Sequence, residues 1–275
     1  MNLIYQPAVN TSLDELAEIT NSAFQGYIGG EIHMTAALMA FFITQNNVDL
    51  NLSQIALLDD TPLGIAMVAR RGWTSRLAMM GIVTDSQEKG VGKAFMQKLI
   101  ELSQTRGDHA YELECFEQNE RGVRLYQGAG FTVTRRLLGY QLDNPAAEDD
   151  ADLTEIDIYD VARMVVTHGA KDLPWQLSGS SLMRSGPPHV GLRLGEAYAI
   201  ISSPEHANIT LRALIVPPPQ QRQEHGSRLL RALFARYPGK HWNIPPICPE
   251  EFDGFLTQYG FVQQTLNQFQ MRMEY

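Results

Sequence analysis

Residues 81–92 constrain this chain more than any other part of its sequence. A short apolar strand ends near Val83, a polar loop with glycines at positions 90 and 92 follows, and an amphipathic helix begins at those glycines. The first turn of a helix has backbone N–H groups without intrahelical partners and a partial positive charge, and glycine lets a ligand approach closely. The stretch therefore predicts a binding site for a phosphate group.

Two common phosphate-binding loops do not fit the spacing of this loop. A P-loop requires a glycine five residues before Gly92 and a Ser or Thr at position 94, but Gln87 and Ala94 stand there. A dinucleotide-binding loop requires a third glycine at position 95, which is a phenylalanine. The pattern that remains is Gln-x-x-Gly-x-Gly, formed by Gln87, Gly90 and Gly92.

A second motif follows one helix and one strand later. It consists of Leu113-Glu114-Cys115, then Asn119, then Leu125-Tyr126 and Gly130-Phe131. In this order the two motifs closely resemble those of the GNAT superfamily of N-acyltransferases, and together they cover most of residues 1–142. The resemblance implies transfer of an acyl group, usually acetyl, from acetyl-CoA to an amine.

The order of elements in the first half predicts a mixed α/β (α+β) fold. Apolar spacing indicates a strand, two helices, three strands, a helix, a strand, a helix and a last strand. Ser12 and Glu15 have the spacing of a capping box at the start of the first helix. As in the GNAT superfamily, we expect a largely antiparallel sheet flanked by helices.

The second half of the chain repeats parts of the first. Gly226 begins a helix as Gly92 does, and residues 255–261 have the aromatic and glycine pattern of residues 125–131. The offsets between these pairs, 134 and 130 residues, agree closely, and such internal similarity indicates duplication. We expect a GNAT acetyltransferase domain over residues 1–143, a linker over residues 144–152, and a GNAT-like domain over residues 153–275.

The second copy lacks the features that support activity in the first. Glu224 stands in the place of Gly90, and Leu256 replaces Tyr126. Three prolines at positions 217–219 make the backbone that leads into the second loop less flexible. A carboxylate beside a pyrophosphate repels it, so we expect a degenerate domain that forms a wall of the acceptor site or mediates dimerisation. A second CoA site is the alternative.

The resemblance implies a set of CoA-binding residues in the first copy. In the superfamily the strand before the loop separates from its neighbour and offers backbone groups to the pantetheine arm, while the loop N–H groups face the pyrophosphate. Asn119 bonds pantetheine or caps the next helix, and both roles stay open. The implied residues are Ile82, Val83, Gln87, Glu88, Lys89, Gly90, Val91, Gly92, Lys93, Asn119 and Gly122.

Tyr126 is the candidate catalytic residue. An amine that attacks a thioester must expel a thiolate, and a phenol near the sulfur can protonate it by general acid catalysis. The alternative is a tyrosine that only packs in the core beside Leu125. Cys115 replaces a small apolar residue of the family and has no His partner, so we interpret it as packing.

The sequence assigns no general base. Residues 77–80, where the family commonly places a carboxylate, contain none. Glu31, His33, Glu112 and Glu114 are weaker candidates, and direct transfer without a side-chain base is the alternative. The candidate acceptor-binding residues are Tyr27, Glu31 and Trp73, with Phe24 beside them.

Composition restricts the other classes of function. The formal net charge is −9 and no basic stripe is present, which disfavours nucleic-acid binding. Two cysteines and scattered histidines give no metal-site spacing, and no signal peptide or membrane span is predicted. We expect a cytoplasmic monomer or homodimer that binds acetyl-CoA and a small-molecule amine and holds no metal. The alternative function is a non-catalytic acyl-CoA sensor or scaffold.

Overall fold

The computed structural model describes residues 3–87, 90–146 and 153–275. Contacts divide the chain into two compact units, Met1–Arg136 with Gln268–Tyr275, and Leu137–Asn267. This division differs from the expected one, residues 1–143 and 153–275, because the units exchange strands near the end of each sequence half. Most of the expected linker, residues 147–152, lies outside the described residues.

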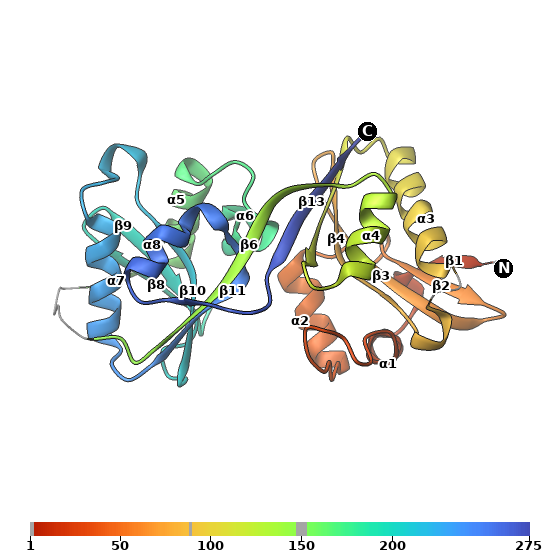
Figure 1. Cartoon of the computed structure of the whole chain (residues 1–275), viewed down its shortest axis with the longest axis horizontal. Coiled ribbons are helices and arrows are strands. Elements are labelled where there is room, and N and C mark those ends of the chain that lie inside the picture. Colours follow the sequence, from red (N-terminus) through yellow and green to blue (C-terminus); the bar gives the residue numbers. More distant parts are fainter. Residues whose placement is uncertain (1–2, 88–89, 147–152) are drawn as a thin grey trace. The chain divides into compact units, whose positions relative to one another are not determined.

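The first unit follows the predicted order of elements (Figure 1). Its helices and strands are β1 (Ile4–Pro7), α1 (Leu13–Ala23), α2 (Ala36–Asn46), β2 (Gln54–Leu58), β3 (Thr61–Arg71), β4 (Thr74–Ile82), α3 (Val91–Thr105), β5 (Ala110–Phe116), α4 (Glu120–Gly128), the start of β6 (Thr132–Asp143) and β13 (Gln268–Glu274). The strands are ordered β1-β2-β3-β4-β5-β13, followed by residues 132–136 of β6. The β1–β2, β2–β3, β3–β4 and β5–β13 pairs are antiparallel, and the β4–β5 pair is parallel.

Helices cover both faces of the first sheet (Figure 1). On one face α3 and α4 pack over a core that includes Phe95, Leu99 and Leu113. On the other face α1 and α2 pack over a core that includes Leu16, Met39 and Ile65. The mixed, largely antiparallel and helix-flanked fold expected from the sequence is confirmed.

Local sequence signals account for the start of α1 and for the turn between β2 and β3. The Ser12 side chain accepts from the Glu15 N–H, and the Glu15 carboxylate accepts from the Ser12 N–H, so the predicted capping box is present. The hairpin between β2 and β3 turns at Asp59 and Asp60, whose φ angles are 47° and 62°. Two consecutive positive φ angles are typical of the tight turns that join antiparallel strands.

The β4 and β5 strands separate part of the way along their length. Residues 74–77 of β4 pair with residues 110–113 of β5, but β4 continues to Ile82 and β5 to Phe116 without further pairing between them. The register of β3 against β4 shifts at the same level, where Ala78 is the extra residue of a bulge. Unpaired backbone therefore faces the gap between the two strands.

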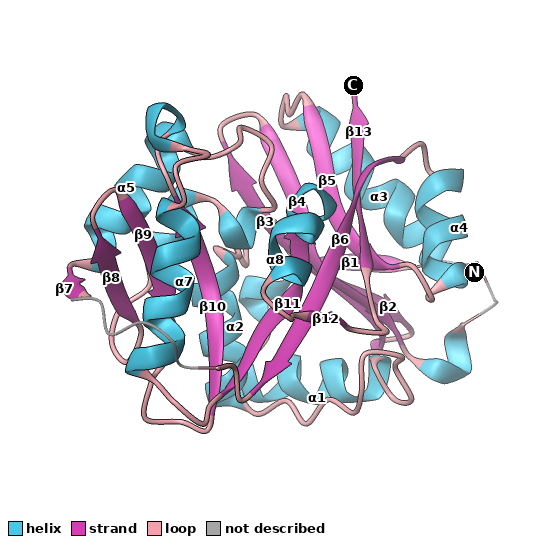
Figure 2. Cartoon of the chain, turned by 60° about the vertical axis from the view of Figure 1, so that its left-hand side comes forward, coloured by secondary structure: helices cyan, strands magenta, loops and turns pink. Residues whose placement is uncertain are grey.

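The second unit repeats this arrangement (Figure 2). Its elements are β7 (Thr154–Ile156), α5 (Ile158–His168), α6 (Gly179–Leu182), β8 (Val190–Leu194), β9 (Ala197–Ile201), β10 (Asn208–Ile215), α7 (His225–Arg236), β11 (His241–Pro249), α8 (Asp253–Gln258) and β12 (Val262–Gln263). The pair α7 and α8 packs on one face of the sheet, and α5 and α6 pack on the other. The β10 and β11 strands pair only through residues 208–210 and 241–243, and Arg212 is the extra residue of a bulge, 134 positions after Ala78.

Each unit takes one strand from the other half of the sequence. In the first unit β13, from the carboxyl-terminal end, pairs with β5 along its full length (blue in Figure 1). In the second unit residues 137–143 of β6 lie between β11 and β12. Residues 269–271 resemble residues 140–142 in sequence. The two segments lie in β13 and β6, which are the strands that occupy matching places in opposite units.

The sequence did not predict β11. This strand contains Pro245, Pro246 and Pro249, and proline cannot donate a hydrogen bond to a neighbouring strand. The register of β11 against β6 shifts between Ile244 and Cys248. The shift takes the two central prolines out of the ladder, so that pairing resumes after them.

Candidate active site

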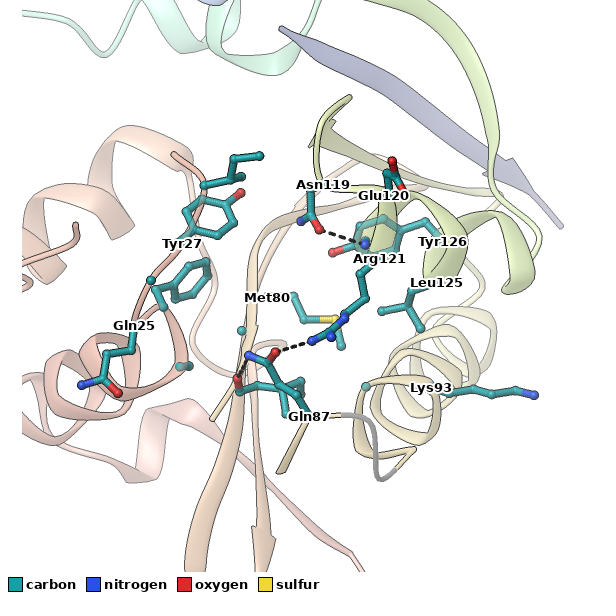
Figure 3. Close-up of a pocket in the computed structure, with 18 of the residues that line it drawn as sticks. Gln25, Tyr27, Met80, Gln87, Lys93, Asn119, Glu120, Arg121, Leu125 and Tyr126 are labelled. Atoms are coloured by element: carbon teal, nitrogen blue, oxygen red, sulfur yellow. Dashed lines mark hydrogen bonds between the residues drawn. The ribbon is translucent and has the colours of Figure 1, made fainter. Parts of the chain in front are cut away.

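A cavity of about 760 Å³ opens where β4 and β5 have separated, and every residue that lines it belongs to the first unit (Figure 3). Three segments form its walls: the end of α1 with the loop after it, the end of β4 with the glycine loop and α3, and the first turns of α4. The lining residues are Ala23, Phe24, Gln25, Gly26, Tyr27, Ile28, Met80, Gly81, Ile82, Gln87, Gly90, Gly92, Lys93, Gln118, Asn119, Glu120, Arg121, Gly122, Leu125 and Tyr126.

The glycine loop leaves the start of α3 open to the cavity. Gly90 has φ +81°, a left-handed conformation that glycine adopts without strain, and α3 begins at Val91. Among the described residues no side chain caps this helix, whereas α1, α2 and α4 each begin with a side-chain cap. The N–H groups of the first turn of α3 are therefore available to a ligand. The predicted loop residues Glu88 and Lys89 lie outside the described residues.

The side chain of Gln87 braces the loop against the end of β4. Its Nε2 donates to the carbonyl oxygen of Ile82 at 3.0 Å. The N–H of Val83 donates to the carbonyl of Leu63 at 2.9 Å, so it faces β3 and not the cavity. From the sequence, Val83 was expected to offer backbone groups to the pantetheine arm. Its carbonyl also accepts from the N–H of Ser86 at 2.9 Å, so both backbone groups of Val83 have partners within the protein.

Asn119 begins the opposite wall. Its Oδ1 accepts from the N–H of Gly122 at 3.0 Å, so the expected capping role is present. A Cβ atom on Gly122 would lie 2.7 Å from the Asn119 Nδ2 and 3.0 Å from the Cys115 Sγ. Only glycine fits this position while the asparagine and the cysteine keep their places.

Tyr126 is half-buried on the next turn of α4, and its ring packs edge-on against Phe131. Burial raises the pKa of the Tyr126 phenol, and the neighbouring Cys115 and Tyr27 raise it further. Burial also raises the pKa of Tyr27 to about 12 and that of the Cys115 thiol to about 12. All three groups are protonated at neutral pH, which makes Cys115 a poor nucleophile.

An aromatic wall faces Tyr126 across the cavity (Figure 3). The Tyr27 ring lies 5.1 Å from that of Phe24 and 5.9 Å from that of Phe116. Asn21 holds the loop that carries Tyr27, because its side chain accepts from the N–H of Met34 and donates to the carbonyl of Met34. The wall is therefore fixed to α1 and to β5.

The structure does not bring two predicted acceptor residues to the cavity. Trp73 precedes β4, at the opposite end from the cavity, where it is 65% exposed and packs on His109. Glu31 is exposed and pairs with His33 at 3.4 Å. Neither residue lines the cavity, whereas Tyr27 does.

The candidate bases on β5 have other partners. Glu114 is held by the Arg76 guanidinium in a buried ion pair, with an Nη2–Oε2 distance of 2.6 Å. Glu112 pairs with Arg272 of β13. Within the described part of the chain, the carboxylate that lines the cavity is that of Glu120, which is exposed and pairs with Arg124 at 3.1 Å.

Sequence reasoning missed Arg121. This residue lines the cavity from the first turn of α4, and its Nη1 donates to the Oε1 of Gln87 at 2.6 Å (Figure 3). The guanidinium thus reaches across to the glycine loop. A basic residue two positions after Asn119 was the available signal, but an exposed arginine in a helix is usually only solvated.

The second unit keeps two features of the glycine loop, the glutamine bond and the left-handed residue before the helix. Gln221 Nε2 donates to the carbonyl of Val216 at 2.9 Å, which matches the bond from Gln87 to Ile82. Glu224 has φ 61° and ψ 6°, close to the angles of Gly90, and α7 begins directly after it. Glu224 therefore adopts the left-handed conformation that Gly90 adopts in the first loop.

Comparison with known proteins agrees with this geometry. Residues 13–131 match the model of the Acetyltransferase (GNAT) family. This segment belongs to the GNAT acetyltransferase family. Over 72 residues the chain is 35% identical to mycothiol acetyltransferase from Propionibacterium freudenreichii subsp. shermanii, but the match spans only 26% of this chain and 23% of that relative.

Solved structures extend the likeness of fold to both units. A GCN5-related N-acetyltransferase from Sphaerobacter thermophilus has a TM-score of 0.69 at 13% identity, with 99% of this chain and 95% of that chain covered. A tandem GNAT protein from the clavulanic acid biosynthesis pathway has a TM-score of 0.66 at 13% identity, with 99% and 98% covered. The fold of the chain is thus that of two GNAT domains in tandem.

The described residues contain neither a membrane-spanning helix nor a metal-binding cluster. No helix among them has the length and apolar character to cross a membrane. Among the same residues, no group of three or more His, Cys, Asp and Glu side chains is arranged to hold a metal ion.

Proposed function

We propose that the first unit is an N-acyltransferase that transfers an acetyl group from acetyl-CoA to a primary amine of a small molecule or an amino terminus. One observation carries this proposal: the cavity between β4 and β5 is lined both by the uncapped start of α3 and by the half-buried Tyr126. A phosphate site and a proton donor therefore share one cavity. The name of the relative, mycothiol acetyltransferase, supports acetyl as the group that is transferred.

The cavity suits the parts of acetyl-CoA. The first-turn N–H groups of α3 would bind the pyrophosphate, because they combine free donors with the positive end of the helix dipole. The edge of β4 beyond Leu77, where its pairing with β5 has ended, would bind the amide groups of the pantetheine arm, and the Ile82 carbonyl there also accepts from Gln87. Gly90 and Gly92 allow close approach, and Asn119 and Gly122 would line the thioester end of the arm.

The reaction needs one proton donor, and Tyr126, which lines the cavity, would supply it. The amine nitrogen forms a bond to the thioester carbonyl carbon, the carbon–sulfur bond breaks, and the sulfur leaves as a thiolate. The Tyr126 hydroxyl gives its proton to that sulfur. Burial raises the pKa of the Tyr126 phenol, so the hydroxyl is protonated and available as a donor when the sulfur leaves.

The amine loses its protons to solvent in this mechanism: the ammonium form gives up one before attack, the attacking nitrogen gives up a second as the amide forms, and solvent returns a proton to the Tyr126 phenolate. Among the described residues the cavity offers only the exposed Glu120 as a carboxylate, and Glu114 is held by Arg76. The amine must then arrive in its neutral form. The aromatic wall of Phe24 and Tyr27 would contact the acceptor, while Glu31 and Trp73, which lie away from the cavity, carry no role in this proposal.

The test of this function is thiol release from acetyl-CoA across a panel of primary amines and amino-terminal peptides. We expect turnover with at least one class of amine and none with the matching N-acetylated compounds. Tight CoA binding without turnover on any amine would favour the alternative function, an acyl-CoA sensor or scaffold.

We also propose that the second unit is a non-catalytic GNAT domain. Glu224 and Leu256 stand in the places of Gly90 and Tyr126 within a loop and helix of the same geometry. Calorimetry should give one CoA per chain. Two equivalents per chain would contradict the proposal.

A further inference from the structure

Arg212 is a half-buried arginine of the second unit that has no acidic partner. It is the extra residue of the bulge in β10, between Leu211 and Ala213. Its guanidinium forms no hydrogen bond or ion pair with any residue that the structure describes. Burial lowers the pKa of this group. Because arginine is rarely taken out of water without a partner, Arg212 is a candidate for binding an anion.

The bulge lies beyond the point at which β10 and β11 stop pairing. The two strands pair only through residues 208–210 and 241–243. The next residues of β10 on the side of α5 and α6 are Ala213 and Ile215, which pack on the core beneath those helices. Arg212 therefore lies where one edge of β10 is no longer occupied by its neighbour.

The first unit shows that the bulge itself does not need an arginine. Ala78 is the extra residue of the matching bulge in β4, and it packs against the core beneath α1 and α2. A small apolar side chain therefore suffices for the backbone geometry. The guanidinium in the second unit adds a charge that the fold does not require.

A second cationic group lies near Arg212. The N–H and the ring Nδ1 of His189 both contact the carbonyl of Gly186, at 3.1 and 3.0 Å. A carbonyl oxygen can only accept, so Nδ1 holds the hydrogen and the Nε2 is the nitrogen left for a ligand. Burial lowers the pKa of His189, the bond to Gly186 opposes this, and the charge of Arg212 lowers it further. The two side chains are thus close enough to repel each other when both are charged.

A buried hydroxyl without a partner belongs to the same turn as His189. The Ser185 Oγ has no hydrogen-bond partner in the described part of the chain. The backbone of the turn has its own bonds, from the Ser185 N–H to the carbonyl of Leu182 and from the His189 N–H to that of Gly186. Since buried polar groups nearly always form hydrogen bonds, this hydroxyl is a donor that the turn leaves unused.

A carboxylate fits this set of groups better than a phosphate does. A guanidinium presents its N–H donors in a fork that matches the two oxygens of a carboxylate. A negative charge between Arg212 and His189 replaces their repulsion by attraction. Arg212 is the one permanent charge of the set, so it neutralises a singly charged ligand, whereas phosphate brings nearly two negative charges to a half-buried place.

We propose that the second unit binds the carboxylate group of a small molecule, with Arg212 as the anchoring residue and His189 and Ser185 as further hydrogen-bond donors. The inference does not rest on the proposed function, because it concerns the other unit and involves no CoA. It gives the second unit a ligand of its own while leaving it without catalysis.

The binding test is saturation-transfer NMR on the full chain, at constant ionic strength, with acetate, benzoate and inorganic phosphate as probes. We expect the two carboxylates to bind with dissociation constants of about 1 mM and phosphate at least about tenfold more weakly. Arg212→Leu should weaken benzoate binding at least about tenfold, and Ser185→Ala about two- to tenfold. The matched control is Arg228→Gln, an exposed arginine of α7 on the opposite face of the sheet, which should bind benzoate as the unaltered chain does.

Thermal unfolding of the same variants separates binding from a structural role. Arg212→Leu removes an unpaired, half-buried charge, so its unfolding midpoint without ligand should equal or exceed that of the unaltered chain. Benzoate at 10 mM should raise the midpoint of the unaltered chain and leave that of Arg212→Leu in place. A lower midpoint in Arg212→Leu without ligand would assign the arginine to the fold and overturn the inference.

Four binding results would also overturn it. The unaltered chain might bind neither acetate nor benzoate, or Arg212→Leu and Ser185→Ala might both bind benzoate unchanged. An equal loss in Arg228→Gln would reduce the effect to general charge. Tighter binding of phosphate than of either carboxylate would contradict the assigned ligand.

Discussion

The two glycine-type loops of this chain share several backbone features among their described residues and differ in the charge of the residue before the helix. Each begins with a short 3-10 turn, Thr84–Ser86 or Pro218–Gln220, and each has a glutamine bonded to the carbonyl at the end of the preceding strand. Each also has a left-handed residue directly before its helix, Gly90 in the first loop and Glu224 in the second.

The comparison shows that the left-handed conformation before the helix does not require a glycine. A glutamate in the left-handed conformation costs about 1–2 kcal/mol relative to the right-handed one, yet the second unit keeps it. Packing fixes the shape, because positions around Gly92 and Gly226 are filled by matching side chains, Leu125 and Ile82 in one unit and Phe255 and Val216 in the other. What distinguishes the two sites is charge and the presence of Tyr126.

The largest expected effect comes from converting the first loop into the second. Gly90→Glu should keep the fold, because Glu224 shows that the same angles accept a glutamate. A carboxylate beside a pyrophosphate costs about 4 kcal/mol, so we expect CoA affinity to fall about a thousandfold. The control is Gly90→Asn, which tolerates the left-handed conformation without a charge and should lose less than about tenfold. Calorimetric titration with CoA measures both; equal losses would make conformation, not charge, the cause.

The second prediction concerns the other distinguishing residue. Tyr126→Phe should leave CoA affinity unchanged and lower turnover by roughly ten- to a thousandfold, because it removes only the proton donor. Steady-state kinetics with an identified amine, alongside CoA titration, separates the two quantities. Unchanged turnover would mean that Tyr126 only packs, as Leu256 does in the second unit.

The third prediction is a pH profile that follows from Tyr126 and from the lack of a buried base in the described cavity. We expect kcat/KM to rise about tenfold per pH unit below the pKa of the acceptor amine, since only the neutral amine attacks. Burial raises the pKa of Tyr126 and that of Tyr27, the latter to about 12, so both stay protonated and no decline is expected below about pH 10. A bell-shaped profile with a maximum near neutral pH would contradict this assignment of the acid.

The smallest expected effect tests the strain in the second loop. Glu224→Gly should stabilise the second unit by about 0.5–1 kcal/mol, because glycine adopts a positive φ more readily, partly offset by its flexibility when unfolded. Urea unfolding followed by the fluorescence of the buried Trp242 measures this change. Glu224→Ala removes the charge but keeps the strained angle, and it should leave stability nearly unchanged. A similar gain in both variants would assign the effect to charge.

The amino-acid sequence by itself determined the features that are encoded over short spans. The capping box at Ser12, the order of elements in the first half and the duplication at an offset near 130 residues were all predicted and are present. Helix periodicity and turn chemistry act between residues a few positions apart, so they can be read without knowing the fold. The family motif also predicted that Asn119 and Gly122 line the same cavity as Gly90.

The tertiary structure decided what depends on distant pairing. It placed β13 beside β5 and residues 137–143 of β6 beside β11, which no local pattern indicates. It turned the Val83 N–H toward β3, kept Trp73 and Glu31 away from the cavity, and brought Arg121 to Gln87. Strand partners more than a hundred residues apart are selected by how well two surfaces pack together. The direction of a side chain toward a cavity follows only after those strands are in place.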